Sequence, residues 1–219
     1  YPINLDAPVF TITHQLGLEG FIGGEYRYNE TELGVYKRIW MPQSGGKIDT
    51  WIKAGAQWNK VPFPLLIVPA ANLSYISEYE TFNLINNMEF LNDRYASLDM
   101  SWDLNGKIFN RIPLLKELHW REYLGVKMLW GKLTDKNNPF LDKNKSDNML
   151  FNFPALYDQN GNITQYRSFV MGNTPYIEVI AGIHNIFNIL HVEYVRRLTY
   201  LDLPTATKWG IRLRVMMTF

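Results

Sequence analysis

The chain has 219 residues and carries 22 Lys and Arg against 21 Asp and Glu, so its formal net charge is only +1. This balance lacks the electrostatic signature of a nucleic-acid-binding domain, and no nucleic-acid partner is expected. Cysteine is absent, which excludes disulfides, thiolate nucleophiles and cysteine-based metal sites.

Alternating apolar and polar residues dominate the chain and predict β-strands, because successive side chains of a strand point to opposite faces. No segment of helical length shows a 3.6-residue period. In chain order the nine predicted strands are 9–17, 30–41, 48–58, 82–91, 95–104, 121–130, 176–184, 191–200 and 208–219. Tight polar connections at 92–93 and 185–188 indicate hairpin turns. The predicted fold class is therefore all-β and antiparallel.

The lengths of these strands and of their connections favour a membrane barrel. Several predicted strands are longer than the ~5–6 residues usual in globular proteins and match the ~9–11 residues that cross a membrane. The connection at about 134–173 is long and polar, and we expect it to be extracellular. Short turns at one end and long loops at the other are typical of outer-membrane barrels. The longest apolar run, 61–71, contains three prolines and does not predict a membrane-spanning helix.

Tryptophan and tyrosine gather near predicted strand ends, as in the two aromatic girdles of a transmembrane barrel. The set comprises Trp40, Trp51, Trp58, Tyr95, Trp102, Trp120, Tyr123, Trp130, Tyr176, Tyr200 and Trp209. The alternative is a soluble β-sandwich or lipocalin-like ligand-binding module whose aromatic residues fill its core. Alternation by itself does not separate the two interpretations.

The last predicted strand closes on an aromatic residue. An amphipathic strand of this kind resembles the assembly signal of bacterial outer-membrane barrels. The residues that carry this signal are Trp209, Ile211, Leu213, Val215, Met217 and Phe219.

Charged and histidine side chains on the polar faces of the last three predicted strands form a candidate lumenal network. A charge on the lipid face costs ~2–4 kcal/mol at mid-membrane, so these residues are expected to point inward. The set is Glu178, His184, His191, Glu193, Arg197, Arg212 and Arg214. The spacing of the histidines matches no metal motif, and we favour a hydrogen-bonded network over a metal or acid–base site.

Enzymatic activity is not expected. A third hypothesis, an outer-membrane hydrolase, needs a serine with a base within hydrogen-bond reach. The chain has no Gly-x-Ser-x-Gly elbow.

Two connections carry further hypotheses. Pro62, Phe63, Pro64, Leu65 and Leu66 form a stiff apolar loop that either packs against the barrel or docks a partner protein. Residues 158–162 read DQNGN, which predicts a turn, with a weak Ca²⁺ site as the alternative. No other cofactor is expected.

Several stretches together resemble a known family: 58–66 (WNKVPFPLL), 82–95 (FNLINNMEFLNDRY), 110–122 (NRIPLLKELHWRE), 197–202 (RLTYLD) and 210–212 (GIR). They resemble the C-terminal part of a Bacteroidota-type family of large outer-membrane proteins of unknown function, in which a carboxypeptidase-regulatory-like β-sandwich precedes a β-barrel. The resemblance implies that residues 1–219 are the C-terminal portion of a larger barrel in the outer membrane.

The same resemblance implies contact with outer-membrane lipid and with other envelope proteins. The chain is then expected to be a subunit or accessory of a transport, export or envelope-assembly system. The Arg-Gly-Phe loop motif of outer-membrane insertases is not found in the sequence. An accessory role is therefore favoured over an insertase role.

Overall fold

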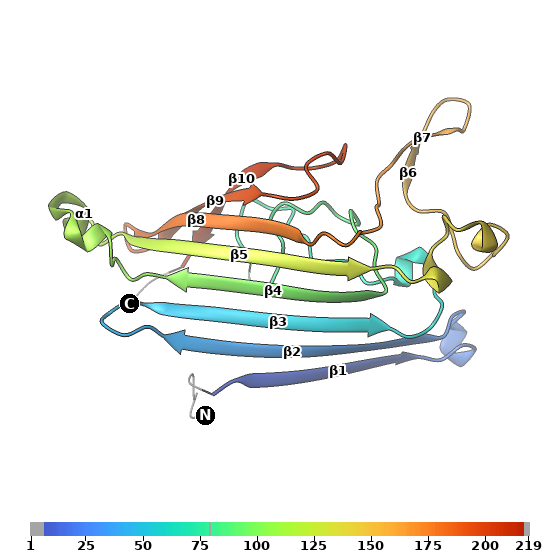
Figure 1. Cartoon of the computed structure of the whole chain (residues 1–219), viewed down its shortest axis with the longest axis horizontal. Helices are drawn as coiled ribbons and strands as arrows, with labels where there is room; N and C mark the ends of the chain where they lie inside the picture. The colour runs from blue at the N-terminus through green and yellow to red at the C-terminus, as the bar shows by residue number, and fades with distance from the viewer. Residues whose placement is uncertain (1–6, 79, 217–219) are drawn as a thin grey trace.

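The computed structural model describes residues 7–78 and 80–216, and one large antiparallel sheet dominates it (Figure 1). Its strands follow the order β1-β2-β3-β4-β5-β8-β9-β10. Their bounds are β1 (Val9–Gly17), β2 (Tyr28–Trp40), β3 (Lys47–Gln57), β4 (Arg94–Asp103), β5 (Arg121–Lys132), β8 (Tyr176–Ile186), β9 (Leu190–Arg197) and β10 (Trp209–Val215). The sheet is not closed, because β1 and β10 end the strand order and do not pair with each other in the described residues.

The remaining elements are short. A separate hairpin of β6 (Ala155–Tyr157) and β7 (Ile163–Tyr166) lies in the connection between β5 and β8. The only α-helix of the described residues is α1 (Pro113–Glu117), and none of their helices is long and apolar enough to cross a membrane. Single 3₁₀ turns are η1 (Phe21–Gly23), η2 (Phe63–Leu65), η3 (Phe109–Arg111), η4 (Asp135–Asn137) and η5 (Asp142–Asn144).

The all-β antiparallel prediction is confirmed, and eight of the nine predicted strands correspond to strands of the large sheet. The predicted strand 82–91 is wrong. There the amides of Asn83 and Leu84 donate to the side chain of Glu178 instead of to a neighbouring strand. Consecutive residues are buried at 82–85 and again at 89–91, so the alternation of this segment does not reflect two different faces. Without this strand, 92–93 is not a hairpin turn, whereas the turn between β8 and β9 is confirmed.

The sheet has an exposed apolar face and a covered polar face. One row of paired residues across six strands is entirely apolar and consists of Phe10, Val35, Ile52, Leu98, Met128 and Ile177. The adjacent row, on the opposite face, consists of Tyr36, Trp51, Asp99, Lys127, Glu178 and Arg197. Phe10 is 71% exposed and Ile52 50%, whereas Lys127 is 6% exposed and Arg197 is fully buried. This distribution is the reverse of that in a water-soluble domain.

The aromatic residues divide between the two faces. Trp102, Trp130 and Trp209 lie on the apolar face, as expected for girdle residues. Trp51, Tyr95, Tyr123 and Tyr176 have the opposite register and lie on the polar face. Pairing register, and not proximity to a strand end, decides which face an aromatic side chain occupies.

Residues 58–93, between β3 and β4, fold back over the polar face, and we call them the returning segment (Figure 1, cyan to green). Pro62, Pro64 and Pro69 lack a backbone donor and keep its first part out of a strand ladder. The buried apolar clusters form where this segment meets the sheet and the connection after β5. One contains Phe82, Ile85, Phe90, Leu129, Met171 and Tyr176, and another contains Val61, Leu66, Leu91, Leu133 and Phe153.

Candidate functional site

All seven residues of the predicted polar network lie on β8, β9 and β10. Alternation places them on the covered face, where the returning segment supplies most of their partners. They form three groups, of which the second and third are linked through Tyr176 and Leu84. Each group joins the sheet to a different part of the returning segment.

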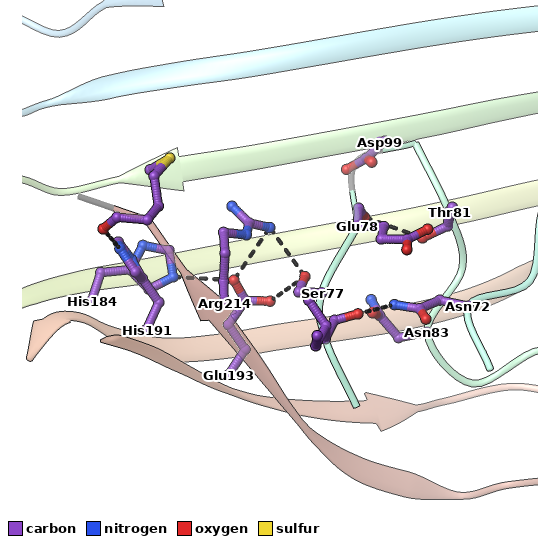
Figure 2. Close-up of polar contacts among 12 residues, drawn as sticks. Asn72, Ser77, Glu78, Thr81, Asn83, Asp99, His184, His191, Glu193 and Arg214 are labelled. Atoms are coloured by element: carbon purple, nitrogen blue, oxygen red, sulfur yellow. Dashed lines mark hydrogen bonds and ion pairs between the residues drawn. The ribbon is translucent and has the colours of Figure 1, made fainter. Parts of the chain in front are cut away.

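Glu193 is the centre of the first group (Figure 2). Its carboxylate accepts a hydrogen bond from Ser77 Oγ at 3.0 Å and lies 3.1 Å from His184 Nε2 and 3.4 Å from Arg214 Nη2. Arg214 also donates to Ser77 Oγ at 3.0 Å. Glu193 has no solvent exposure, so these partners replace its water of hydration.

The two histidines of this group also contact each other and their surroundings. The ring of His184 stacks on Tyr123 with 4.2 Å between centroids and meets the ring of His191 edge-on at 4.3 Å. His191 Nε2 lies 3.4 Å from the carbonyl oxygen of Met216. These contacts fix both rings on one wall of the covered face.

Glu178 organises the second group. It is fully buried and accepts from the backbone N–H groups of Asn83 and Leu84 at 2.9 and 3.1 Å, and from Tyr176 Oη at 2.8 Å. Arg212 donates to the carbonyl oxygen of Asn83. One carboxylate thereby holds two successive amides of the returning segment.

Arg197 forms the third group. Its Nη2 pairs with Glu89 Oε1 at 2.8 Å, and its guanidinium donates to the carbonyl oxygens of Thr199 and Tyr200, both at 3.0 Å. The guanidinium also lies 4.9 Å from the ring centroid of Tyr176. A fully buried arginine is satisfied here by a carboxylate, carbonyls and a ring face.

The sequence did not identify the partners from the returning segment, namely Ser77, Asn83 and Glu89. Their only signal was the presence of polar residues in a mostly apolar stretch, and the incorrect strand at 82–91 concealed it. Their partners in the sheet are 116, 95 and 108 positions away. No local pattern reports contacts at such separations.

In the residues that the structure describes, no serine hydroxyl is hydrogen-bonded to a histidine, although Thr31 Oγ1 lies 2.9 Å from His14 Nδ1 at an exposed position. The imidazoles of His184 and His191 contact Glu193 and the Met216 carbonyl, and those of His14 and His119 contact Thr31 and the Glu117 carbonyl. Ser77 Oγ is bonded to Glu193 and Arg214. Within the same residues, no group of three His, Asp or Glu side chains could hold a metal ion.

A cavity of about 390 Å³ opens beside the Glu193 group, at the end of the sheet where the β2–β3 and β8–β9 turns lie. Its wall includes His184, His191 and Arg214, together with Arg121 of β5 and Lys47 of β3. A second cavity of about 330 Å³ lies between the returning segment and β2–β5 and contains Glu30, Glu32, Lys53 and Tyr95. The covered face therefore encloses space as well as polar groups.

The predicted docking loop contacts the rest of the chain. Pro62 and Leu66 are buried, Phe63 and Leu65 are half-buried, and Pro64 is exposed. Leu66 joins a buried cluster with Leu91, Leu133 and Phe153, and Phe63 and Leu65 pack against that cluster. Little of this loop is exposed. Docking of a partner protein there stays a prediction.

In the turn at 158–162, the side chain of Asp158 accepts hydrogen bonds from other residues of the same turn. Asp158 Oδ1 accepts the backbone N–H groups of Asn160 and Asn162 at 2.9 and 2.7 Å, and Oδ2 accepts Asn162 Nδ2 at 3.2 Å. These donors hold the pKa of the exposed Asp158 carboxyl below its usual value, with the backbone of Asn162 the largest cause. The predicted turn is present, and calcium binding there stays a prediction.

The predicted assembly signal lies on β10, at one end of the strand order. Trp209, Ile211, Leu213 and Val215 are exposed on the apolar face, from 39% for Leu213 to 74% for Val215. Met217 and Phe219 lie outside the described residues. The free edge of β10 is partly covered, because Leu213 N donates to the Tyr75 carbonyl and Ser77 N donates to the Leu213 carbonyl.

Comparison with known proteins identifies one family. The model of the C-terminal domain of a family of unknown function (DUF5686) matches residues 1–142. This match includes β1 to β5, the returning segment and α1. No curated protein and no solved structure matches the chain. The chain therefore belongs to the family of unknown function DUF5686, through the C-terminal domain of that family.

Proposed function

We propose that this chain forms part of the wall of a transmembrane β-barrel in a bacterial outer membrane, as the Bacteroidota-type resemblance implies. Its role is non-enzymatic, as a subunit or accessory of a transport, export or envelope-assembly system. One observation carries the membrane proposal: the eight adjacent strands expose an apolar face, and from β3 to β9 the opposite, polar face is covered. A barrel in lipid has this arrangement, with lipid outside and a polar interior.

The soluble alternative fits this observation less well. A β-sandwich or lipocalin-like domain buries its apolar face, and its exposed face is polar. Here Ile52 is 50% exposed and Leu124 45%, whereas Glu178 and Glu193 have no exposure. In water the exposed apolar face would be an aggregation hazard, whereas in a bilayer it is solvated by acyl chains.

Two charges on the apolar face are compatible with a tilted barrel. Lys37 and Arg196 belong to the same row of paired residues, at its β2 and β9 positions. Adjacent strands are ~4.8 Å apart and barrel strands tilt by ~35–45°. In a membrane, the β2 and β9 positions of that row would therefore differ in depth by about 15 Å. Lys37 and Arg196 can then extend towards opposite headgroup regions.

The edges of the sheet support a larger barrel. In lipid, the unpaired N–H and C=O groups of β1 and β10 need partners, since no water is present to bind them. Further strands must therefore close the wall. In our proposal, a longer form of this chain supplies them.

Paired cysteine variants test the membrane proposal, because the chain has no cysteine of its own. Leu98→Cys and Met100→Cys place a fluorophore on the apolar face, and their neighbours Ser97→Cys and Ser101→Cys place it on the polar face. In native membranes or liposomes with brominated acyl chains, we expect quenching only at the first pair. Equal quenching at all four positions, or release of the chain by carbonate, would contradict the proposal.

The proposed role in an envelope system has its own test. The native mass of the particle solubilised from its source membrane is measured, and its protein components are identified. A multi-protein particle supports the transport, export or assembly role. A lone species of 25.6 kDa, the mass of this chain, would contradict that role and the larger barrel.

A further inference from the structure

Four basic side chains from four neighbouring strands lie together at the end of the sheet that carries the short turns. Arg121 of β5 pairs with His184 of β8, and His191 of β9 pairs with Arg214 of β10. The two imidazole rings lie 4.3 Å apart and connect these pairs. All four side chains line the cavity of about 390 Å³, and Figure 2 shows His184, His191 and Arg214 close together.

The carboxylates near the cavity do not neutralise the positive charge of these basic side chains. Glu193 is shared between His184, Arg214 and Ser77. Asp49, on the cavity wall, already accepts two bonds from Arg38 at 2.6 and 3.0 Å. Within the described residues, the side chain of Arg121 makes no hydrogen bond or ion pair, and only its backbone pairs, with β8.

Lys47 adds a further cation to the wall, with its Nζ 4.0 Å from Asp49 Oδ2, and Asp103 is the remaining carboxylate there. Asp103 accepts the backbone N–H of Asn105 at 3.0 Å. The cavity therefore keeps an excess of positive charge, which an anion would neutralise.

Two buried polar atoms on the same wall also lack partners. His191 is 2% exposed, and its Nδ1 has no hydrogen-bond partner in the described residues. Asn185 is 5% exposed and donates from Nδ2 to the His119 carbonyl at 2.8 Å, while its Oδ1 has no partner there. Such atoms are rarely left unsatisfied in a native protein. A ligand that both accepts and donates hydrogen bonds would satisfy them.

We propose that this cavity binds a phosphate monoester of a polyol. A phosphate offers several oxygens to the Arg121 guanidinium and, when His191 carries its proton on Nδ1, to that nitrogen, and guanidinium forks match phosphate geometry. Asn185 Oδ1 and the Asp103 carboxylate accept hydrogen bonds, so they require hydroxyl donors next to the phosphate. A simple inorganic anion leaves these acceptors unused, whereas the polyol part supplies the donors.

The size and remaining walls of the cavity fit this class of ligand. Its volume lies at the lower end of the ~300–1,000 Å³ of small-molecule sites. Trp40, Met41 and Met216 form its apolar part, and Trp40 is 54% exposed. The indole offers a flat apolar surface to the carbon skeleton of a polyol.

Binding of sn-glycerol 3-phosphate to the full chain in detergent, measured by calorimetry, tests this proposal. Arg121→Gln is the main variant, because Arg121 has no described partner whose loss would disturb the fold. Arg167→Gln makes the same change on the exposed connection after β7 and is the control. We expect Arg121→Gln to weaken binding by about 10- to 100-fold, as for loss of a charge-assisted hydrogen bond, and Arg167→Gln to have no effect.

His191→Gln provides a second variant, with an expected loss of binding in the same direction. Inorganic phosphate should bind more weakly than glycerol phosphate, and glycerol alone should not bind. Liposomes with and without phosphatidic acid then distinguish a lipid-borne phosphate from a free one. No binding of either phosphate source to the wild-type chain, or equal losses in Arg121→Gln and Arg167→Gln, would overturn the proposal. Neither result affects the quenching test, because the cavity proposal does not rest on membrane insertion.

Discussion

Arg197 of β9 and Glu89 of the returning segment form an ion pair at 2.8 Å in which neither side chain has any solvent exposure. The pair joins residues 108 positions apart and attaches the returning segment to the polar face. Ser77–Glu193 and Asn83–Glu178 are further buried attachments of the same segment. Charge-assisted contacts thus hold the returning segment on the covered face, in addition to the buried apolar clusters.

Glu89→Gln should lower the free energy of unfolding by about 3–5 kcal/mol, because it leaves the buried Arg197 charge uncompensated. Chemical unfolding in detergent measures the change. Lys143→Gln removes a cation from the exposed pair with Asp135 and should cost less than about 1 kcal/mol. The double variant Glu89→Leu/Arg197→Met should recover much of the loss, and a double variant less stable than Glu89→Gln would contradict this account of the pair.

Glu178→Gln tests how the second group holds the returning segment. The substitution places an amide NH₂ where a carboxylate oxygen accepted an N–H, so we expect a loss of about 1.5–3 kcal/mol. Hydrogen exchange should show the Asn83 and Leu84 amides becoming less protected, since both donate to Glu178. Asp135→Asn, at the exposed first residue of η4, is the matched control. Unchanged protection of both amides in Glu178→Gln would rule out this role.

Gly46 closes the β2–β3 turn at a position that only glycine fits. Its φ is +79°, and an added Cβ would lie 1.7 Å from the carbonyl oxygen of Asp103. Gly46→Ala should therefore destabilise the chain by more than the ~1–2 kcal/mol of a left-handed alanine alone. Gly161 has a similar φ of +81°, and a Cβ added there would have no atom within 4 Å. Gly161→Ala therefore measures the backbone cost without a clash. Equal melting temperatures of the two variants would argue against the clash.

The carboxyl of Asp158 should titrate below its usual pKa, because the donors of its own turn favour the charged form. A lowered pKa in the folded state means that this contribution to turn stability is present above the unfolded pKa and is lost as the pH falls through the folded one. Carbon-detected NMR titration of the side chain measures it. Asn162→Ala removes only the Nδ2 donor and keeps the backbone N–H, so it should raise the pKa part of the way towards the ordinary aspartate value. A pKa unchanged by Asn162→Ala would remove the Asn162 side chain as a cause.

Local sequence pattern predicted the strands well and the connections poorly. The alternation in β4, β5 and β10 reports directly which residues share a face. The strand predicted at 82–91 failed because its neighbours are side chains of β8 and β9 on one side and a buried cluster on the other. The hairpin of β6 and β7 was missed because strands of three and four residues are too short to show a period.

The sequence by itself determined the all-β class, the residues that share each face, and the polar set on β8, β9 and β10. These features follow from a two-residue period, which any strand imposes on its own side chains. The sequence also predicted that the polar face points inward, whereas only the tertiary structure decided that residues 58–78 and 80–93 cover it. The tertiary structure also decided that Arg121, His184, His191 and Arg214 surround one cavity. The reason is that these relationships depend on pairing between distant strands and on the path of a loop, neither of which has a local signature.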